Sequence, residues 1–321
     1  MPPKRDKIST WETLRERVLS LASPCRLCPR ECGARRLQGE EGFCRTGLRP
    51  LVSSVCLHRG EEPALSGEKG ICNVFLAHCS LECRFCQNHQ ISNNRSTRSE
   101  WDISSGNLAE KVLPLLEQGE GNLGLVTPTH QLPALIELLI ELGQRGKFPT
   151  VVYNSSGYER LEVLSLLAET VDVYLPDLKY SGEAAARAGS GTGDYPEHSR
   201  EALKEMFRQK GPDLRLDRRG MARDGLIVRH LVLPGGTRDS IAVLRFLAEE
   251  LSPGISLSLM SQYHPPASLH NDPRWGRTLT AGEYALVTTA AEQLGFRRGW
   301  QQALESPESY LPDFERDEPF A

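Results

Sequence analysis

The sequence predicts an α/β protein in which helices cover a largely parallel sheet. From residue 71 onward, short apolar runs typical of buried strands alternate with longer segments that carry apolar residues at helical spacing. This alternation is typical of parallel sheets, because each strand must be followed by a crossover that returns the chain to the same end of the sheet. A chain of 321 residues is also long enough to bury a substantial core in such a domain.

The first predicted element is a short amphipathic helix over residues 9–22. Ser9 and Glu12 have the spacing of a capping box, and four apolar residues fall on one helical face. These apolar residues are Trp11, Leu14, Val18 and Leu21. A cysteine-rich, loop-rich segment follows, so we assign residues 1–70 to an N-terminal helix with a metal-binding segment.

Residues 71–300 carry six predicted strands and six predicted helices. The strands are residues 72–77, 123–126, 150–153, 171–175, 226–232 and 255–259. The helices are residues 108–118, 132–142, 158–168, 199–209, 240–251 and 281–294. The remaining residues, 301–321, form an acidic, proline-containing tail that we expect to wrap the surface or to be partly disordered.

The charge balance excludes several classes of partner. The net charge is −4 and the isoelectric point is near 6.1, so no general nucleic-acid-binding surface is implied. No apolar run approaches 18 residues, and the basic N-terminus lacks the apolar region of a secretory signal, so we expect a cytoplasmic protein without membrane spans. The charged stretch between residues 209 and 225 is interpreted as a solvated hairpin or loop, with a docking feature for a macromolecule as the alternative.

Cys79, Cys83 and Cys86 form the most informative motif, Cys-x3-Cys-x2-Cys, directly after the first predicted strand. Three thiolates can hold three irons of a [4Fe-4S] cluster and leave the fourth iron open to a small molecule, whereas a fourth thiolate would close the cluster. The alternative is a zinc site completed by His78 or His89. In a reducing compartment, nine cysteines in tight groups indicate metal or redox chemistry rather than disulfides.

A second group of four cysteines lies in the N-terminal segment. Cys25, Cys28, Cys32 and Cys44 occur within about 20 residues, a density that indicates metal binding. Spacing does not distinguish zinc from an iron–sulfur cluster here. Cys56 and Cys72 lie outside both groups, and we interpret them as core residues.

These motifs resemble those of a known family. The three-cysteine run resembles the signature of radical S-adenosylmethionine (SAM) enzymes, and nearly the whole chain resembles the PflX-like family related to pyruvate formate-lyase activating enzyme. The N-terminal motifs are Cys25-x-x-Cys28-Pro29-Arg30-x-Cys32-Gly33, Gly39-Glu40-x-Gly42-x-Cys44 and Gly60-Glu61-Glu62-Pro63. The others are Cys86-Gln87-Asn88, Val126-Thr127-Pro128-Thr129-His130, Tyr153-Asn154-Ser155-Ser156-Gly157-Tyr158, Tyr174-Leu175-Pro176-Asp177-Leu178-Lys179-Tyr180, Arg229-His230-Leu231-Val232-Leu233-Pro234-Gly235 and Met260-Ser261-Gln262-Tyr263.

The resemblance implies a fold and a chemistry. It implies a partial (β/α)6 TIM-like barrel whose active site lies at the C-terminal ends of the strands. It further implies that a [4Fe-4S] cluster reductively cleaves SAM to methionine and a 5′-deoxyadenosyl radical, which abstracts hydrogen from a substrate. That substrate is a glycine of a partner enzyme in the related activating enzymes, and a peptide or small molecule is the alternative. A reductase such as flavodoxin or ferredoxin would supply the electron.

The resemblance also places candidate SAM contacts along the strand ends. These are Phe85, Thr127, Thr129, Asn154, Ser155, Asp177, Lys179 and Arg229. Phe85 precedes the last cysteine, where relatives have an aromatic residue beside the adenine, although it could equally be core. Asp177 and Lys179 alternate onto one face and could bind SAM or only each other. Arg229 suits the SAM carboxylate, and if it is buried it requires an anionic partner.

Two features leave other interpretations open. The segment Thr127-Pro128-Thr129 stands where activating enzymes carry Gly-Gly-Glu-Pro, so functional equivalence does not follow directly. Gln262 and Tyr263 could line the substrate end or pack at the rim. A different class of protein, an iron–sulfur or zinc electron-transfer module without SAM chemistry, would also use these cysteines, although it would need far less chain.

Overall fold

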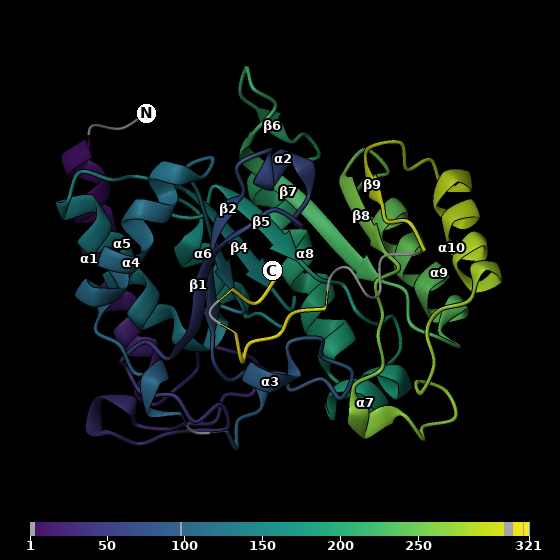
Figure 1. Ribbon diagram of the computed structural model, residues 1–321, viewed down its shortest axis with the longest axis horizontal. Coiled ribbons are helices and arrows are strands. Elements are labelled where there is room, and N and C mark those ends of the chain that lie inside the picture. Colours follow the sequence, from purple (N-terminus) through teal and green to yellow (C-terminus); the bar gives the residue numbers. More distant parts are fainter. Residues whose placement is uncertain (1–3, 97, 305–310, 317, 321) are drawn as a thin grey trace.

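The computed structural model describes residues 4–96, 98–304, 311–316 and 318–320. Within these residues the protein is an α/β fold in which one curved, largely parallel sheet is flanked by helices, as Figure 1 shows. The predicted fold class, an open partial (β/α)6 barrel, is confirmed. None of the described helices is long and apolar enough to cross a membrane.

The sheet follows the order β1-β2-β3-β4-β5-β7-β8-β9, with β6 paired to β7 outside this path. Strands β2 to β9 along this path are parallel to their neighbours, and β1 is antiparallel to β2. The described bounds are β1 Val52–His58, β2 Ile71–Leu76, β3 Asn122–Val126, β4 Thr150–Ser155, β5 Val173–Pro176, β6 Arg215–Leu216, β7 Ala222–Leu231, β8 Ser256–Met260 and β9 Gly299–Gln301. The sheet therefore ends at β1 on one side and at β9 on the other.

All six predicted strands are present, and three strands were missed. The six carry apolar runs because they are buried on both faces; every residue of β2, for example, is buried. Strand β1 contains two serines, β6 is only two residues long, and β9 has two exposed residues among its three. None of these three presents the continuous apolar run by which a central strand is recognised.

The crossovers are helical, and the six predicted helices are confirmed. The long helices are α1 Lys4–Leu21, α4 Ser105–Gln118, α5 Leu132–Gln144, α8 Tyr195–Lys210, α9 Thr237–Phe246 and α10 Ala281–Gln293. Shorter helices are α2 Pro63–Ser66, α3 His89–Ser92, α6 Leu161–Leu167 and α7 Glu183–Ser190, and α9 continues into a π-helical turn, Leu247–Leu251. Short 3-10 turns are η1 Arg36–Gln38, η2 Ser99–Trp101, η3 Thr129–Gln131 and η5 Ala267–Leu269.

Helix α1 confirms the predicted apolar face but corrects its start. The helix is already formed at Lys4, so Ser9 is an interior residue and the predicted capping box with Glu12 is wrong. Lys4, Arg5 and Lys7 before Ser9 are good helix formers, and the helix extends through them without a recognisable start signal. The face that carries Trp11 and Val18 is fully buried in the main core.

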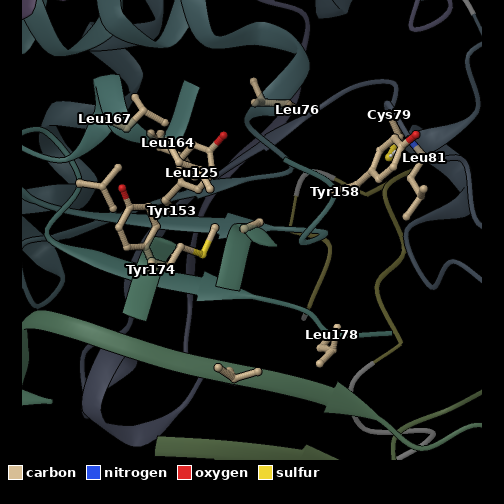
Figure 2. Close-up of a cluster of buried hydrophobic side chains, with 14 of the residues drawn as sticks. Leu76, Cys79, Leu81, Leu125, Tyr153, Tyr158, Leu164, Leu167, Tyr174 and Leu178 are labelled. Atoms are coloured by element: carbon tan, nitrogen blue, oxygen red, sulfur yellow. Dashed lines mark hydrogen bonds between the residues drawn. The ribbon is translucent and has the colours of Figure 1, made fainter. Parts of the chain in front are cut away.

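The hydrophobic core is continuous between the N-terminal segment and the barrel. Side chains of α1, α4, α5 and the strands belong to one cluster of buried residues. Figure 2 shows Cys79, Leu81 and Tyr158 grouped at one end of this core, and Tyr153 with Tyr174 at the other. Strand β1 also extends the sheet, so the proposed boundary near residue 70 is not a break in packing.

Between residues 209 and 225 the chain forms the predicted hairpin, with β6 antiparallel to β7. Several of its charges are paired internally: Lys210 lies 2.8 Å from Asp224, and Arg223 lies 2.8 Å from Asp217. Arg219 instead pairs with Glu120, outside the hairpin, at 3.0 Å. Arg223 also donates to Asn122, the first residue of β3, at 2.7 Å. The hairpin therefore lies at the N-terminal ends of the strands, away from the three-cysteine loop.

The described part of the C-terminal tail wraps the surface, which is one of the two alternatives predicted for it. The rings of Phe314 and Phe320 have centroids 5.2 and 5.5 Å from that of Phe75 on β2. In Figure 1 the yellow tail crosses in front of the sheet. Residues 305–310, 317 and 321 lie outside the described residues, so the prediction of partial disorder is not addressed for them.

Candidate functional site

The three-cysteine loop begins where β2 ends, and one buried asparagine organises it. Asn94 accepts from the Cys79 backbone N–H at 2.9 Å and donates to the Cys79 carbonyl at 2.9 Å. Its own backbone N–H donates to the Glu82 carboxylate at 2.8 Å. His78 and Glu82 hold left-handed backbone with φ of 67° and 54°, which non-glycine residues adopt rarely and mostly where the surroundings impose it.

The thiols of Cys79, Cys83 and Cys86 line one cavity, and no other cysteine is among its described lining residues. Burial raises the pKa of Cys79 and of Cys83 to about 11, and it also raises the pKa of Cys86. Ser190 on α7 donates to the Cys83 sulfur at 3.0 Å. Metal binding would release the thiol protons, since the thiolate is the ligand.

One of the two histidines in the zinc alternative for these cysteines has other contacts. His78, one predicted fourth ligand, has its ring nitrogens 3.0 Å from the Cys44 carbonyl and 2.7 Å from the Ser96 carbonyl. Thiolates of a four-iron cluster each bind a different iron, so they need not surround a single point as zinc ligands must.

The cavity has a volume of about 470 Å³, within the range of small-molecule sites. Besides the cysteines, its lining comes mainly from residues at the C-terminal ends of the parallel strands, where barrels of this kind place their sites. Those strand-end residues are Val126, Thr127, Asn154, Ser155, Ser156, Asp177, Lys179, Arg229, Leu231, Ser258, Met260 and Gln262.

Seven of the eight predicted SAM contacts line this cavity, and Thr129 does not. Thr129 is 1% exposed and donates to the buried Glu159 carboxyl at 2.5 Å. Thr127 does line the cavity, with φ of 58°, and its N–H donates to the Asn154 carbonyl at 2.8 Å. The turn after Thr127 directs the Thr129 side chain into the core, and a SAM contact through the Thr129 backbone stays a prediction.

Asp177 and Lys179 lie on one face, as their alternation predicted, and pair at 2.5 Å. Burial would lower the pKa of Lys179, but the Asp177 carboxylate outweighs it and the pKa is raised. Lys179 is also the cation that interacts with all three cysteines of the motif. The pair therefore forms a salt bridge and still presents an ammonium beside the thiols.

Arg229 has the anionic partners that its burial required, but they are protein side chains. Its Nε donates to Glu62 at 2.8 Å, its Nη2 donates to the other Glu62 oxygen at 2.6 Å, and Nη2 also contacts Glu61. Burial alone would raise the pKa of Glu61, but Arg229 and the Asn73 amide stabilise the carboxylate. The pKa of Glu61 is therefore lowered. Two glutamates therefore already satisfy the guanidinium, and the predicted pairing of Arg229 with the SAM carboxylate stays a prediction.

Phe85 packs in the core, as one of its two interpretations predicted, and its contact with the adenine stays a prediction. The residue is 4% exposed, and its ring centroid lies 6.0 Å from that of Tyr180 and 5.7 Å from that of Trp275. It also lines the cavity beside Cys83 and Cys86. Gln262 lines the cavity too, whereas Tyr263 is buried and donates to the Trp275 carbonyl at 2.6 Å, so it packs at the rim.

Sequence reasoning missed several lining residues that reach the cavity from outside the six strands. Glu61 and Glu62 come from the turn before α2, and His58 from the end of β1. The Gly60-Glu61-Glu62-Pro63 motif was a signal for the two glutamates, but nothing local predicted that β1 would fold back beside them. Gln87 and Gln302 were also missed; Gln262 donates to Gln87 at 2.9 Å and accepts from Gln302 at 2.6 Å.

The four N-terminal cysteines are brought together by the fold. Cys25, Cys28 and Cys44 are buried and Cys32 is exposed. The side chain of Arg36 lies among them, and its Nη2 donates to the Cys44 sulfur at 3.2 Å. Metal binding by this group stays a prediction.

Comparisons with known proteins place the chain beside a few distant relatives. No protein-family profile matches it. It is 27% identical to an uncharacterized protein of Methanocaldococcus jannaschii over 276 residues, which cover 84% of this chain and 74% of that protein.

Solved structures similar to this chain share little sequence with it. Native anSMEcpe with bound AdoMet has a TM-score of 0.46 and 14% identity, over 74% of this chain and 62% of that one. Streptococcus suis SuiB bound to S-adenosylmethionine has a TM-score of 0.47 and 13% identity, over 70% and 48% of the two chains. This chain thus spans between about half and three fifths of those solved chains.

Proposed function

We propose that this protein is a radical SAM enzyme. The observation that carries the proposal is that three thiols, Cys79, Cys83 and Cys86, line one cavity together with the polar ends of the parallel strands, without a fourth cysteine among the described lining residues. Three cysteine ligands leave one iron of a four-iron cluster open for a small molecule. The strand ends offer the charged and amide groups that a zwitterionic nucleoside such as SAM requires.

The donor set fits a [4Fe-4S] cluster and SAM. Cys79, Cys83 and Cys86 would hold the cluster, and the remaining cavity would hold SAM. When bound together, the cluster and SAM would supply a 5′-deoxyadenosyl radical: one electron cleaves SAM and releases methionine, and the radical takes a hydrogen atom from the substrate. An external reductase such as flavodoxin or ferredoxin would deliver that electron.

The protein residues act by binding and orientation. The positive charge of Lys179 acts on all three thiols and opposes the rise in their pKa. We therefore assign Lys179, in place of Arg229, to the SAM carboxylate. Asn154 and Ser155 at the end of β4 offer hydrogen bonds to the ribose, and Phe85 offers an aromatic face to the adenine. Arg229, held by Glu61 and Glu62, fixes the part of the cavity lining that these three residues form.

The substrate we infer is a polypeptide. The cavity lining carries the side-chain amides of Gln87, Gln262 and Gln302, which can donate to and accept from a peptide backbone. Pro312 and Phe320 of the tail already line the same cavity, so an extended chain segment fits across this opening. A glycine of a partner enzyme, as the motif resemblance implies, is the first polypeptide substrate to test.

The experiment is anaerobic reconstitution with iron and sulfide, followed by incubation with SAM and dithionite. We expect the protein to release 5′-deoxyadenosine, and we expect Cys79→Ala, Cys83→Ala and Cys86→Ala each to abolish the release. Cys56→Ala is the matched control, because Cys56 is buried on β1 and lies outside both cysteine groups. A wild-type protein with a full cluster that forms no 5′-deoxyadenosine, with or without candidate polypeptides, would refute the assignment.

A further inference from the structure

The described part of the C-terminal tail is anchored beside α3 and reaches the cavity from there. Gln90 on α3 donates to Asp313 at 3.2 Å and accepts from the Phe314 N–H at 2.8 Å. The Asp313 N–H in turn donates to the Pro319 carbonyl at 2.8 Å, so the chain turns back on itself. Phe320 follows this turn, and its side chain is part of the cavity lining.

Phe320 lies against two aromatic rings that the sheet supplies. Its ring centroid is 3.9 Å from that of His58, the last residue of β1, and 5.5 Å from that of Phe75 on β2. All three rings line the same cavity as the thiols of the three-cysteine loop. We call the space between His58 and Phe75 the aromatic slot. Its walls suit the face or edge of another aromatic ring.

The aromatic slot is built into the sheet, whereas its occupant is not. His58 pairs with Ile71 in the ladder between β1 and β2, and Phe75 pairs with Val126 in the ladder between β2 and β3. In contrast, the tail residues that the structure describes belong to no helix or strand, and Phe320 is only half-buried. The slot would therefore keep its walls if Phe320 left it, because the ladders do not depend on the tail.

The tail also leaves one polar group of the slot unsatisfied. His58 is 8% exposed, and its Nδ1 is buried with no hydrogen-bond partner among the described residues. A buried polar atom without a partner is unfavourable, and the phenyl ring of Phe320 has no group that could pair with it. A polypeptide bound in the slot can bring backbone amides or a hydroxyl as well as an aromatic ring.

We propose that the aromatic slot binds an aromatic side chain of an extended polypeptide, and that Phe320 occupies the slot in the free protein. The inference rests on the proposed function, since it specifies a side chain that a polypeptide substrate places beside the SAM cavity. The tail and a bound polypeptide cannot fill the slot together. The tail therefore lowers the apparent affinity for the polypeptide by the fraction of molecules in which the slot is free.

The first test measures binding of a fluorescent ten-residue peptide with the sequence of residues 311–320. Fluorescence anisotropy is recorded with the full-length, reconstituted protein in the absence of a reductant. We expect Phe320→Ala to bind the peptide at least about tenfold more tightly than the wild type, because a tethered competitor has been removed. Leu286→Ala, at an exposed site on α10, is the control and should match the wild type. Equal affinities of Phe320→Ala and wild type, or no binding to Phe320→Ala, would overturn the proposal.

The second test asks whether the slot selects an aromatic ring. In the Phe320→Ala protein, the peptide version Phe320→Tyr should bind about as well as the parent peptide. The version Phe320→Leu should bind at least about threefold more weakly, because it loses the contact between rings. Adding His58→Leu to the protein should remove this preference, and equal binding of the Phe and Leu peptides before that change would overturn the aromatic selectivity.

Both tests are independent of SAM cleavage, because neither uses SAM or supplies an electron. A failure of peptide binding would leave the release of 5′-deoxyadenosine as it was measured. A failure of that release would in turn leave the peptide affinities unchanged, so the two proposals are refuted by different results.

Discussion

At the scale of single residues, Glu159 shows how the core shapes a titratable group beside the site. Its carboxyl accepts from Thr129 at 2.5 Å and from the Tyr153 hydroxyl at 3.3 Å. Burial raises the pKa of Glu159 to about 7. Among the described residues, the groups that lower this pKa are hydroxyl groups, and none of them is a cation. The folded protein therefore binds this proton more tightly than the unfolded chain does.

The pH dependence of stability follows from this shift. Because the folded pKa of about 7 lies above the unfolded value of 4.5, the stabilisation is complete below pH 4.5 and is lost as the pH rises through 7. Between pH 6 and pH 8 we expect the wild-type protein to lose about 1.4 kcal/mol of unfolding free energy relative to Glu159→Gln, which keeps the hydrogen-bond acceptor. Urea unfolding of both proteins at the two pH values measures this, and equal pH dependence would contradict it.

At the scale of elements, helix α1 packs on α5 at a glycine. A Cβ added to Gly143 would lie 2.9 Å from the Trp11 ring and 3.0 Å from Ile8, so the two helices approach closely there. Trp11 itself is fully buried. This contact joins the N-terminal segment, with its cysteine group, to the barrel.

Two glycine-to-alanine substitutions in helices should therefore have opposite effects. Alanine favours a helix by up to about 1 kcal/mol over glycine. In Gly143→Ala the contact with Trp11 should outweigh this gain and leave a net destabilisation of about 1–2 kcal/mol. Gly282→Ala in α10 is the control, because nothing lies within 4 Å of its added Cβ, and it should be neutral or stabilising. Chemical denaturation of both variants checks the sign; stabilisation by Gly143→Ala would show that the helices can separate without cost.

At the scale of the whole molecule, the tail links the C-terminus to the cavity mouth. Phe320 lies with its ring centroid 3.9 Å from that of His58, and Phe314 packs on Phe75. Gln90 on α3 donates to Asp313 at 3.2 Å and accepts from the Phe314 N–H at 2.8 Å. The tail thus ties together β1, β2 and α3, the elements beside the three-cysteine loop.

Loosening the tail should therefore loosen these elements locally. For the double variant Phe314→Ala/Phe320→Ala we expect amide hydrogens of α3, residues His89–Ser92, to exchange at least about tenfold faster, because the apolar anchors are lost. Leu216→Ala, at an exposed site on the hairpin, should leave them unchanged. Hydrogen exchange followed by mass spectrometry gives both rates, and protection equal to wild type would mean that the tail does not hold α3.

The sequence by itself determined the sheet and the location of the site. The six central strands could be predicted because burial on both faces leaves a local mark, a continuous apolar run, and the order of parallel strands follows the order of such runs. Cys79, Cys83 and Cys86 follow one of these strands, so their place at the C-terminal edge was predictable as well. Asp177 and Lys179 share a face because two residues is the period of extended chain.

Tertiary structure alone decided which partners the buried charges found. Arg229 pairs with Glu61 and Glu62, which lie more than 160 residues earlier in the chain, and Thr129 turns toward Glu159 instead of the cavity. Arg36 reaches the carbonyl of His130 and the thiol of Cys44 only because the N-terminal segment folds onto the barrel. Local patterns report whether a side chain is buried, but the group that a buried charge meets depends on how distant segments pack against it.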